Sequence, residues 1–106
     1  MVLPRNTREK IFEVAESYNI ETQIDVLIEE MSELTKALLK NRRAHKGQTK
    51  ESVRNTEQSI IEEVADVEIM IQQIIYLFEI EDEVLEIIES KLGRQLERIK
   101  KQNIKK

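Results

Sequence analysis

The sequence predicts an all-α protein, a four-helix-type bundle formed by one domain over residues 1–106. Only two Gly and one Pro occur in the chain, too few turn-forming residues for a many-stranded sheet. Apolar residues recur every three or four positions along most of the chain, which is the spacing of amphipathic helices. With 36% charged and 40% hydrophobic residues, the composition is typical of a globular domain rather than a disordered chain.

The first two helices are expected on either side of a short connection. The first is predicted at about 7–18, where Asn6 and Glu9 have the spacing of a capping pair. The second begins near Thr22, a candidate N-cap, and runs to about Arg43. Its apolar stripe consists of Ile24, Leu27, Ile28, Met31, Leu34 and Leu38.

The second half of the chain predicts two further helices. A basic loop is expected over about 41–56, although its second half could already be helical. A long helix is predicted at about 57–79, followed by a break at 80–82 and a fourth helix at about 83–101. A basic C-terminal tail of about 100–106 ends the chain.

The third predicted helix is apolar on two sides. Val67 and Ile74 belong to its main stripe, whereas Ile61, Ile69 and Tyr76 lie opposite. A helix that is apolar all round is covered on both sides in a folded protein. A chain of 106 residues has little material for a second cover, so we expect a homodimer or homotetramer.

Composition also excludes several classes of site and partner. The chain has no Cys and one His, which excludes disulfides, thiolate nucleophiles and multi-histidine metal sites. The segment Met1–Lys10 lacks the apolar stretch of a secretory signal, and no apolar run approaches the roughly 20 residues that cross a bilayer. The basic clusters carry neither interleaved aromatic residues nor a recognised motif. We therefore expect a cytoplasmic protein without a membrane or nucleic-acid partner.

Four acidic residues fall on or near apolar helix faces. On the third predicted helix Glu63 lies inside the apolar arc and Asp66 lies at its edge, three residues further on. Glu30 and Glu33 have the same spacing on the second predicted helix. A buried carboxylate without a partner costs several kcal/mol unless it is protonated, paired or bound to a cation.

Two explanations of these acids stay open at this point. A site made only of carboxylate oxygens suits a hard cation, Mg²⁺ or Mn²⁺. Alternatively, Lys or Arg side chains from another helix form structural ion pairs with the acids, since the third helix itself carries no basic residue. A di-iron centre is set aside because no His follows either acidic pair.

The acidic segments resemble a known family. Residues 29–34 read EExxEL, and residues 63–66 read ExxD within IIEEVADVEIMI. On two successive long helices this pair of motifs resembles the MazG-like, all-α nucleoside triphosphate pyrophosphohydrolases, over about residues 20–100. The resemblance implies a helical bundle of the MazG-like kind.

The resemblance also implies an activity. Glu30, Glu33, Glu63 and Asp66 would be the catalytic residues that bind Mg²⁺, and a (d)NTP would be cleaved between its α and β phosphates to a nucleoside monophosphate and pyrophosphate. Such enzymes clear surplus or unwanted nucleotides from the cell. The sequence has no Ser/His or Cys/His pair and no Gly-rich phosphate loop, so hydrolysis would have to rely on metal ions.

Further residues are candidates for substrate binding. The family grips phosphates with basic residues of its last helix, which implies this role for Lys91 and Arg94. Gln23 lies two turns before Glu30 and is a candidate for contacting the base or sugar.

Two alternative functions stay open. One is a non-catalytic helical module for oligomerisation or regulatory nucleotide binding. The other is a phosphoribosyl-ATP pyrophosphohydrolase, which would use the same fold and chemistry.

Overall fold

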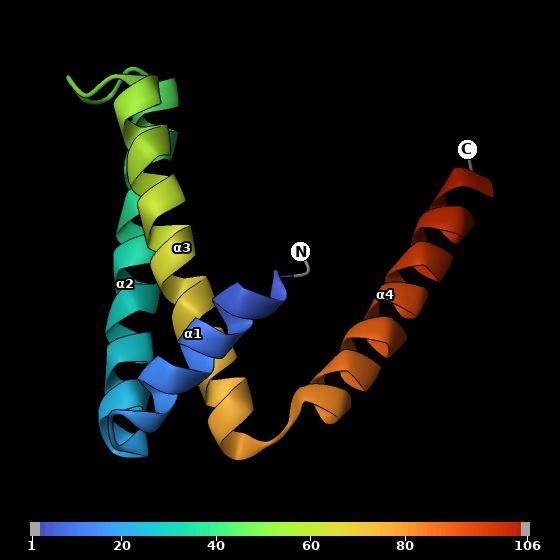
Figure 1. The fold of residues 1–106 in the computed structure, drawn as a ribbon. Coiled ribbons are helices and arrows are strands. Elements are labelled where there is room, and N and C mark those ends of the chain that lie inside the picture. Colours follow the sequence, from blue (N-terminus) through green and yellow to red (C-terminus); the bar gives the residue numbers. More distant parts are fainter. Residues whose placement is uncertain (1–2, 105–106) are drawn as a thin grey trace.

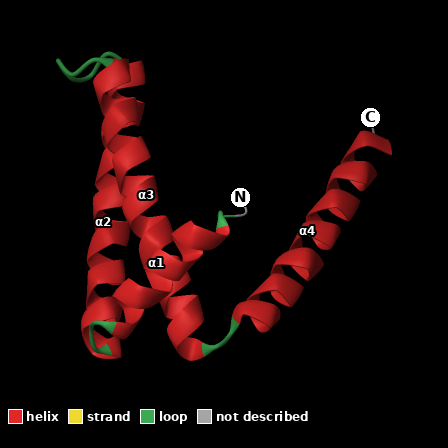
Figure 2. Ribbon diagram, viewed as in Figure 1, coloured by secondary structure: helices red, strands yellow, loops and turns green. Residues whose placement is uncertain are grey.

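The computed structural model describes residues 3–104, and these form four α-helices and no strand (Figures 1 and 2). The helices are α1 (Arg5–Glu16), α2 (Ile20–His45), α3 (Val53–Phe78) and α4 (Glu81–Ile104). The all-α prediction is therefore confirmed. Lys105 and Lys106, the end of the predicted basic tail, lie outside the described residues.

Both predicted N-caps at the start of the chain are wrong. Asn6 and Glu9 lie inside α1, which begins directly after the extended Pro4 and has no side-chain cap. The cap of α2 is Asn19, whose side chain accepts a hydrogen bond from the Thr22 backbone N–H at 2.7 Å. Thr22 is therefore the third residue of its helix. The backbone N–H of the third helical residue is a usual partner of an N-cap side chain.

The connection between α2 and α3 is shorter than the predicted basic loop. Helix α3 begins at Val53 because Ser52 caps it, accepting a hydrogen bond from the Asn55 backbone N–H at 3.1 Å. Asn41 on α2 donates to the hydroxyl of the buried Thr56 at 3.1 Å, and this contact joins the two helices close to their ends. Only residues 46–52 separate the helices.

Helices α2 and α3 lie side by side and antiparallel. Helix α1 crosses the C-terminal half of α3 (Figure 1). The apolar residues buried between these helices are few and small in total volume. They are Ile11, Ala15, Ala37, Val67 and Met70.

Two glutamines fasten the junction of α1, α2 and α3. Gln23 and Gln73 are each only 2% exposed. The Gln23 amide nitrogen donates to the backbone oxygens of Ala15 at 2.8 Å and Tyr18 at 2.9 Å, so it satisfies carbonyls at the end of α1. The Gln73 amide nitrogen donates to the Gln23 side-chain oxygen at 2.7 Å. One uncharged chain of hydrogen bonds thus links all three helices.

An aromatic pair adds a second contact between α1 and α3. The rings of Phe12 and Tyr76 are stacked, with centroids 4.2 Å apart and planes inclined by 14°. The Tyr76 hydroxyl donates to the Glu16 carboxylate, and this hydrogen bond raises the pKa of Tyr76. Part of the second apolar side of α3 is therefore covered by α1 of the same chain.

Helix α4 leaves the other three helices (Figures 1 and 2). The turn consists of Glu79, in the left-handed conformation with φ 55° and ψ 46°, and Ile80. The Ile80 N–H donates to the Ile75 oxygen at 3.2 Å, which closes the end of α3. The radius of gyration is 17.8 Å, whereas a compact chain of about 100 residues has roughly 13 Å. The predicted bundle is thus not closed within one chain.

No helix within residues 3–104 is both long enough and apolar enough to cross a membrane.

Replacing Gln23 by Ala should lower the free energy of unfolding by about 2–3 kcal/mol, because it leaves buried carbonyls and the Gln73 amide without partners. Chemical denaturation at one protein concentration measures the change. Gln58, exposed on α3, is the control, and Gln58→Ala should stay within about 0.5 kcal/mol of the wild type. Equal effects of the two substitutions would contradict the role given to Gln23.

Glu79→Gly should raise the free energy of unfolding by about 0.5–1 kcal/mol, because glycine adopts the left-handed conformation without the steric penalty of a Cβ atom. The matched control is Glu62→Gly on the exposed side of α3, which should lower it by about 1 kcal/mol. Denaturation curves of both variants measure the two changes, and a loss of stability in Glu79→Gly would show that the turn differs from the one described.

Candidate functional site

Helices α2 and α3 bring three acidic side chains together. Glu30 of α2 meets Glu63 and Asp66 of α3, and one carboxylate oxygen from each lies within 4.8 Å of the other two. Glu30 and Glu63 are partly buried, whereas Asp66 is exposed. We call these three residues the carboxylate cluster.

A seven-residue spacing along α2 explains why Glu30 faces α3. Gln23, Glu30 and Ala37 are spaced by seven residues, and the outer two are buried against α3. Residues seven apart lie on the same side of a helix, almost two full turns from one another. Glu30 is therefore directed into the seam between the helices by the backbone itself.

The same spacing holds on α3. Thr56, Glu63 and Met70 are again seven residues apart, and Thr56 and Met70 are both buried. Asp66 precedes the buried Gln73 by seven residues and lies at the edge of the seam. Moving the backbone position of Glu63 away from the seam would require a rotation of α3 that exposes Thr56 and Met70.

The cluster has no basic partner among the described residues. The ion pairs in this part of the chain are Arg5 with Glu9 and Lys36 with Glu33, neither of which involves the cluster. Within residues 3–104, the ion-pair explanation is therefore not realised for Glu30, Glu63 or Asp66. The buried Oε2 atom of Glu63 also accepts no hydrogen bond there.

Burial and mutual repulsion act on the protonation of the cluster. Desolvation, followed by the negative charges of Asp66 and Glu63, raises the pKa of Glu30 above its ordinary value. A group whose charged form is disfavoured in this way is stabilised by a proton or by a nearby cation.

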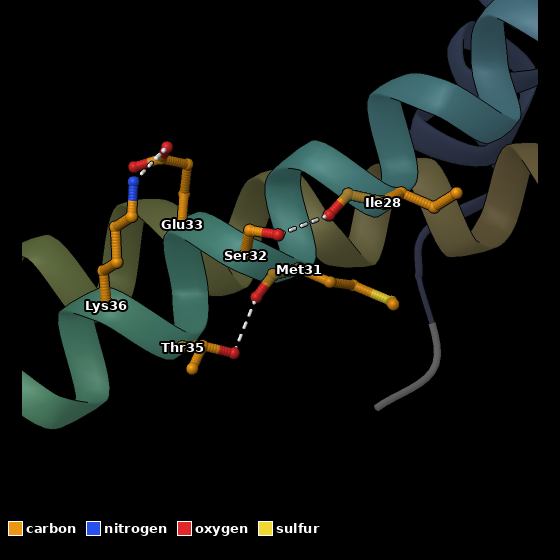
Figure 3. Close-up of polar contacts among 6 residues, drawn as sticks. All are labelled: Ile28, Met31, Ser32, Glu33, Thr35 and Lys36. Atoms are coloured by element: carbon orange, nitrogen blue, oxygen red, sulfur yellow. Dashed lines mark hydrogen bonds and ion pairs between the residues drawn. The ribbon is translucent and has the colours of Figure 1, made fainter.

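The fourth predicted metal ligand, Glu33, is not part of the cluster. It lies one turn after Glu30 on α2, and its carboxylate pairs with Lys36 at 3.5 Å (Figure 3). The pair is largely exposed to solvent, and such ion pairs contribute at most about 1 kcal/mol. A rotation of the Glu33 side chain is therefore inexpensive.

Two hydroxyl groups near Glu33 are used within α2. Ser32 donates to the Ile28 carbonyl at 3.1 Å, and Thr35 donates to the Met31 carbonyl at 3.0 Å (Figure 3). Both bonds run to the preceding turn of α2, and at 100° per residue Ser32 and Thr35 lie on the side of the helix turned away from Glu30.

The predicted substrate-binding residues lie elsewhere. Lys91 and Arg94 are exposed on α4, which diverges from α2 and α3, so the structure does not bring them to the cluster of the same chain. Gln23 is buried, and its amide is bound to Ala15, Tyr18 and Gln73. This placement corrects the expectation that Gln23 contacts a base or sugar, because its donors are already used by the fold.

Sequence reasoning missed a cleft of about 480 Å³ between α1, the end of α3 and the start of α4. Its walls include Arg8, Phe12, Glu16, Tyr76 and Asp82, and no residue of the carboxylate cluster. The spacing of Phe12 and Glu16 on one side of α1 was the available signal. The cleft is separate from the acids, and its Tyr76 and Glu16 side chains are bonded to each other.

The cluster fits a hard divalent cation by its chemistry. All three groups offer carboxylate oxygens, the ligands that Mg²⁺ and Mn²⁺ prefer. Opposite ligands of one Mg²⁺ ion are about 4 Å apart, close to the 4.8 Å that contains the three oxygens. A cation would also provide the missing partner of Glu63 Oε2.

Comparison with known proteins adds no relative to this picture. No family model, no curated protein and no solved structure matches the chain.

In metal-free buffer, Glu30→Gln should become more stable relative to the wild type as the pH rises. The folded-state pKa of Glu30 lies above its ordinary value of 4.5, so its contribution to stability is full below that value and is lost as the pH rises through the folded-state pKa. Denaturation with a chelator present should show nearly equal stabilities at about pH 4 and a more stable variant at about pH 7.5. The control Glu29→Gln, on an exposed neighbour, should show no comparable gain.

Proposed function

We propose that this protein is a Mg²⁺-dependent nucleotide pyrophosphohydrolase, with Mn²⁺ as an alternative ion. It would cleave a (d)NTP between the α and β phosphates to a nucleoside monophosphate and pyrophosphate, and so clear nucleotides from the cytoplasm. The single observation that carries the proposal is the buried oxygen of Glu63, which has no hydrogen-bond partner within residues 3–104 and lies beside two further carboxylates. The resemblance of residues 29–34 and 63–66 to MazG-like enzymes supports the same activity.

The proposed roles follow from where the side chains lie. Glu30, Glu63 and Asp66 would hold the metal ion, and Glu33 would join them by leaving its exposed partner Lys36. When bound, the ion supplies charge neutralisation for the polyphosphate and a lowered pKa for a coordinated water. Because Glu30 and Glu63 are set by packed helices rather than by a loop, they would keep their positions when substrate binds.

The overall reaction needs a water molecule at the α-phosphorus. Its oxygen bonds to that phosphorus, and the bridging oxygen between the α and β phosphates leaves with pyrophosphate. The carboxylates of the cluster would accept the proton of the water, because an ionised carboxylate is a proton acceptor.

The negative charge of the substrate also has to be balanced. We propose that Lys91 and Arg94 contact its phosphates in an assembled homodimer or homotetramer, where α4 lies against another helix. In the single chain these two residues stand on the diverging helix.

A non-catalytic binding module is the second candidate. It is favoured by one observation, namely that Lys91 and Arg94 are not gathered at the carboxylate cluster of their own chain. A module of this kind would bind a metal ion and nucleotide without releasing pyrophosphate.

The test is to incubate the protein with each dNTP and NTP, and with phosphoribosyl-ATP, in the presence of Mg²⁺ and to quantify pyrophosphate and monophosphate. We expect pyrophosphate release from at least one nucleoside triphosphate. Release from phosphoribosyl-ATP alone would assign the reaction to that substrate instead. Absence of release from every substrate would contradict catalysis.

Glu63→Gln should reduce pyrophosphate release by at least about 100-fold, because one carboxylate charge of the proposed metal site is lost. Glu57→Gln, six residues earlier on the exposed side of α3, is the matched control and should keep wild-type activity. Circular dichroism checks folding, and the Mn²⁺ electron paramagnetic resonance signal reports ion binding independently of turnover. Full activity in Glu63→Gln would remove this residue from the site.

A further inference from the structure

Helix α4 carries an apolar stripe that its own chain leaves uncovered. At 100° per residue, the members of the stripe fall within a sector of about 80°. Each is between 46% and 60% exposed. They are Leu85, Ile88, Leu92, Leu96 and Ile99.

Helix α4 needs a protein surface against which its apolar stripe can pack. Most of the stability of a helix in a protein comes from packing of its apolar face, and isolated helices are marginal in water. Every residue of α4 except Val84 is exposed in the single chain. The stripe therefore supplies the surface through which α4 would be stabilised.

A groove between α1 and α3 has a matching character. It has a volume of about 280 Å³ and is lined mainly by apolar side chains. Val64 and Ile69, on its α3 wall, are 47% and 43% exposed. The apolar residues of the groove are Leu3, Ile11, Ile61, Val64, Ala65 and Ile69.

The turn before α4 holds this helix away from the groove of its own chain. The turn is two residues long, and its backbone is hydrogen-bonded to both helices. The Ile80 N–H bonds to the Ile75 oxygen at 3.2 Å, and the Val84 N–H bonds to the Ile80 oxygen at 2.9 Å. Folding α4 back would break this arrangement, whereas a second copy can meet α4 where it stands.

The exposed area is large enough for an extensive interface. The chain exposes 8794 Å², whereas a compact monomer of its mass exposes roughly 6,200 Å². If each of two chains buried half of the difference, the pair would bury about 2,600 Å², which is in the range of obligate homodimers.

Charge favours the same pairing. Residues 55–78, which form most of α3, contain no Lys or Arg, and Glu68 lines the groove. The second half of α4 is basic, with Lys91 and Arg98 on one flank of the stripe and Lys100 on the other. A basic helix over an acidic helix gains attraction at the rim of the contact.

We propose that α4 of one chain packs its apolar stripe into the α1–α3 groove of a second copy, and that the second copy reciprocates. The pairing is of the same patches on both chains, so it closes as a two-fold dimer. It does not depend on the activity of the carboxylate cluster. The occupant is another copy of this chain because one molecule contains both complementary surfaces.

Cysteine cross-linking tests the contact directly, because the chain has no cysteine of its own. Val64→Cys and Leu92→Cys are prepared as two separate proteins, mixed to allow exchange of subunits, and treated with a short bismaleimide. We expect a cross-linked product with the mass of two chains, containing one of each variant. The control mixture replaces Leu92→Cys by Ser90→Cys, on the opposite side of α4, and should give much less product.

The double variant Val64→Cys/Leu92→Cys distinguishes contact between chains from contact within one. A product that keeps the mass of a single chain would show that α4 closes on its own groove, which overturns the proposal. Absence of any product, with folding verified by circular dichroism, would also overturn it.

Sedimentation provides a second test without cross-linking. The wild type should sediment as a dimer or a larger even assembly, and Leu92→Glu should weaken association by at least about 100-fold. Ser90→Glu should associate like the wild type. A monomeric wild type at 100 μM, or equal association of the two variants, would contradict the docking of α4.

Discussion

The seam between α2 and α3 is the constraint on which the rest of the structure depends. Along each helix, positions seven residues apart face the seam, and an acid occupies the position midway between two buried residues on each side. The backbone positions of Glu30 and Glu63 therefore stay at the seam as long as their neighbours in the repeat stay packed. The packing of apolar and amide side chains on either side supplies the energy that keeps these charges close together.

The site could be predicted from sequence where periodicity decides it. Glu63 lies inside the apolar arc of its helix by spacing alone, and Glu30 follows from the same reasoning on α2. Spacing cannot distinguish Glu30 from Glu33, because both lie near the seam and the difference is a side-chain rotation toward Lys36. The MazG-like resemblance and the metal ion stay predictions, since no comparison with known proteins bears on them.

Other features lay outside the reach of a sequence pattern. The composition of residues 41–56 predicts a loop, yet much of this segment is helical, and Asn41 contacts Thr56 across the two helices. The spacing of Gln23 from Glu30 predicts a contact with substrate, but the backbone carbonyls of Ala15 and Tyr18, at the C-terminal end of α1, already bind its amide. The direction of α4 is set by Glu79 in a conformation rare for a residue other than glycine. The sequence of the apolar stripe on α4 does not show whether the same chain or a second chain covers it.

The two glutamines at the helix junction have one more consequence. Neither Gln23 nor Gln73 titrates, and their hydrogen bonds involve amides only. Debye screening, which weakens exposed ionic contacts, has little effect on such a buried neutral network. The glutamine link between α1 and the α2–α3 hairpin is therefore insulated from changes in acidity and salinity, unlike the Tyr76–Glu16 hydrogen bond between α1 and α3, so this link persists while the charge on the neighbouring carboxylates varies.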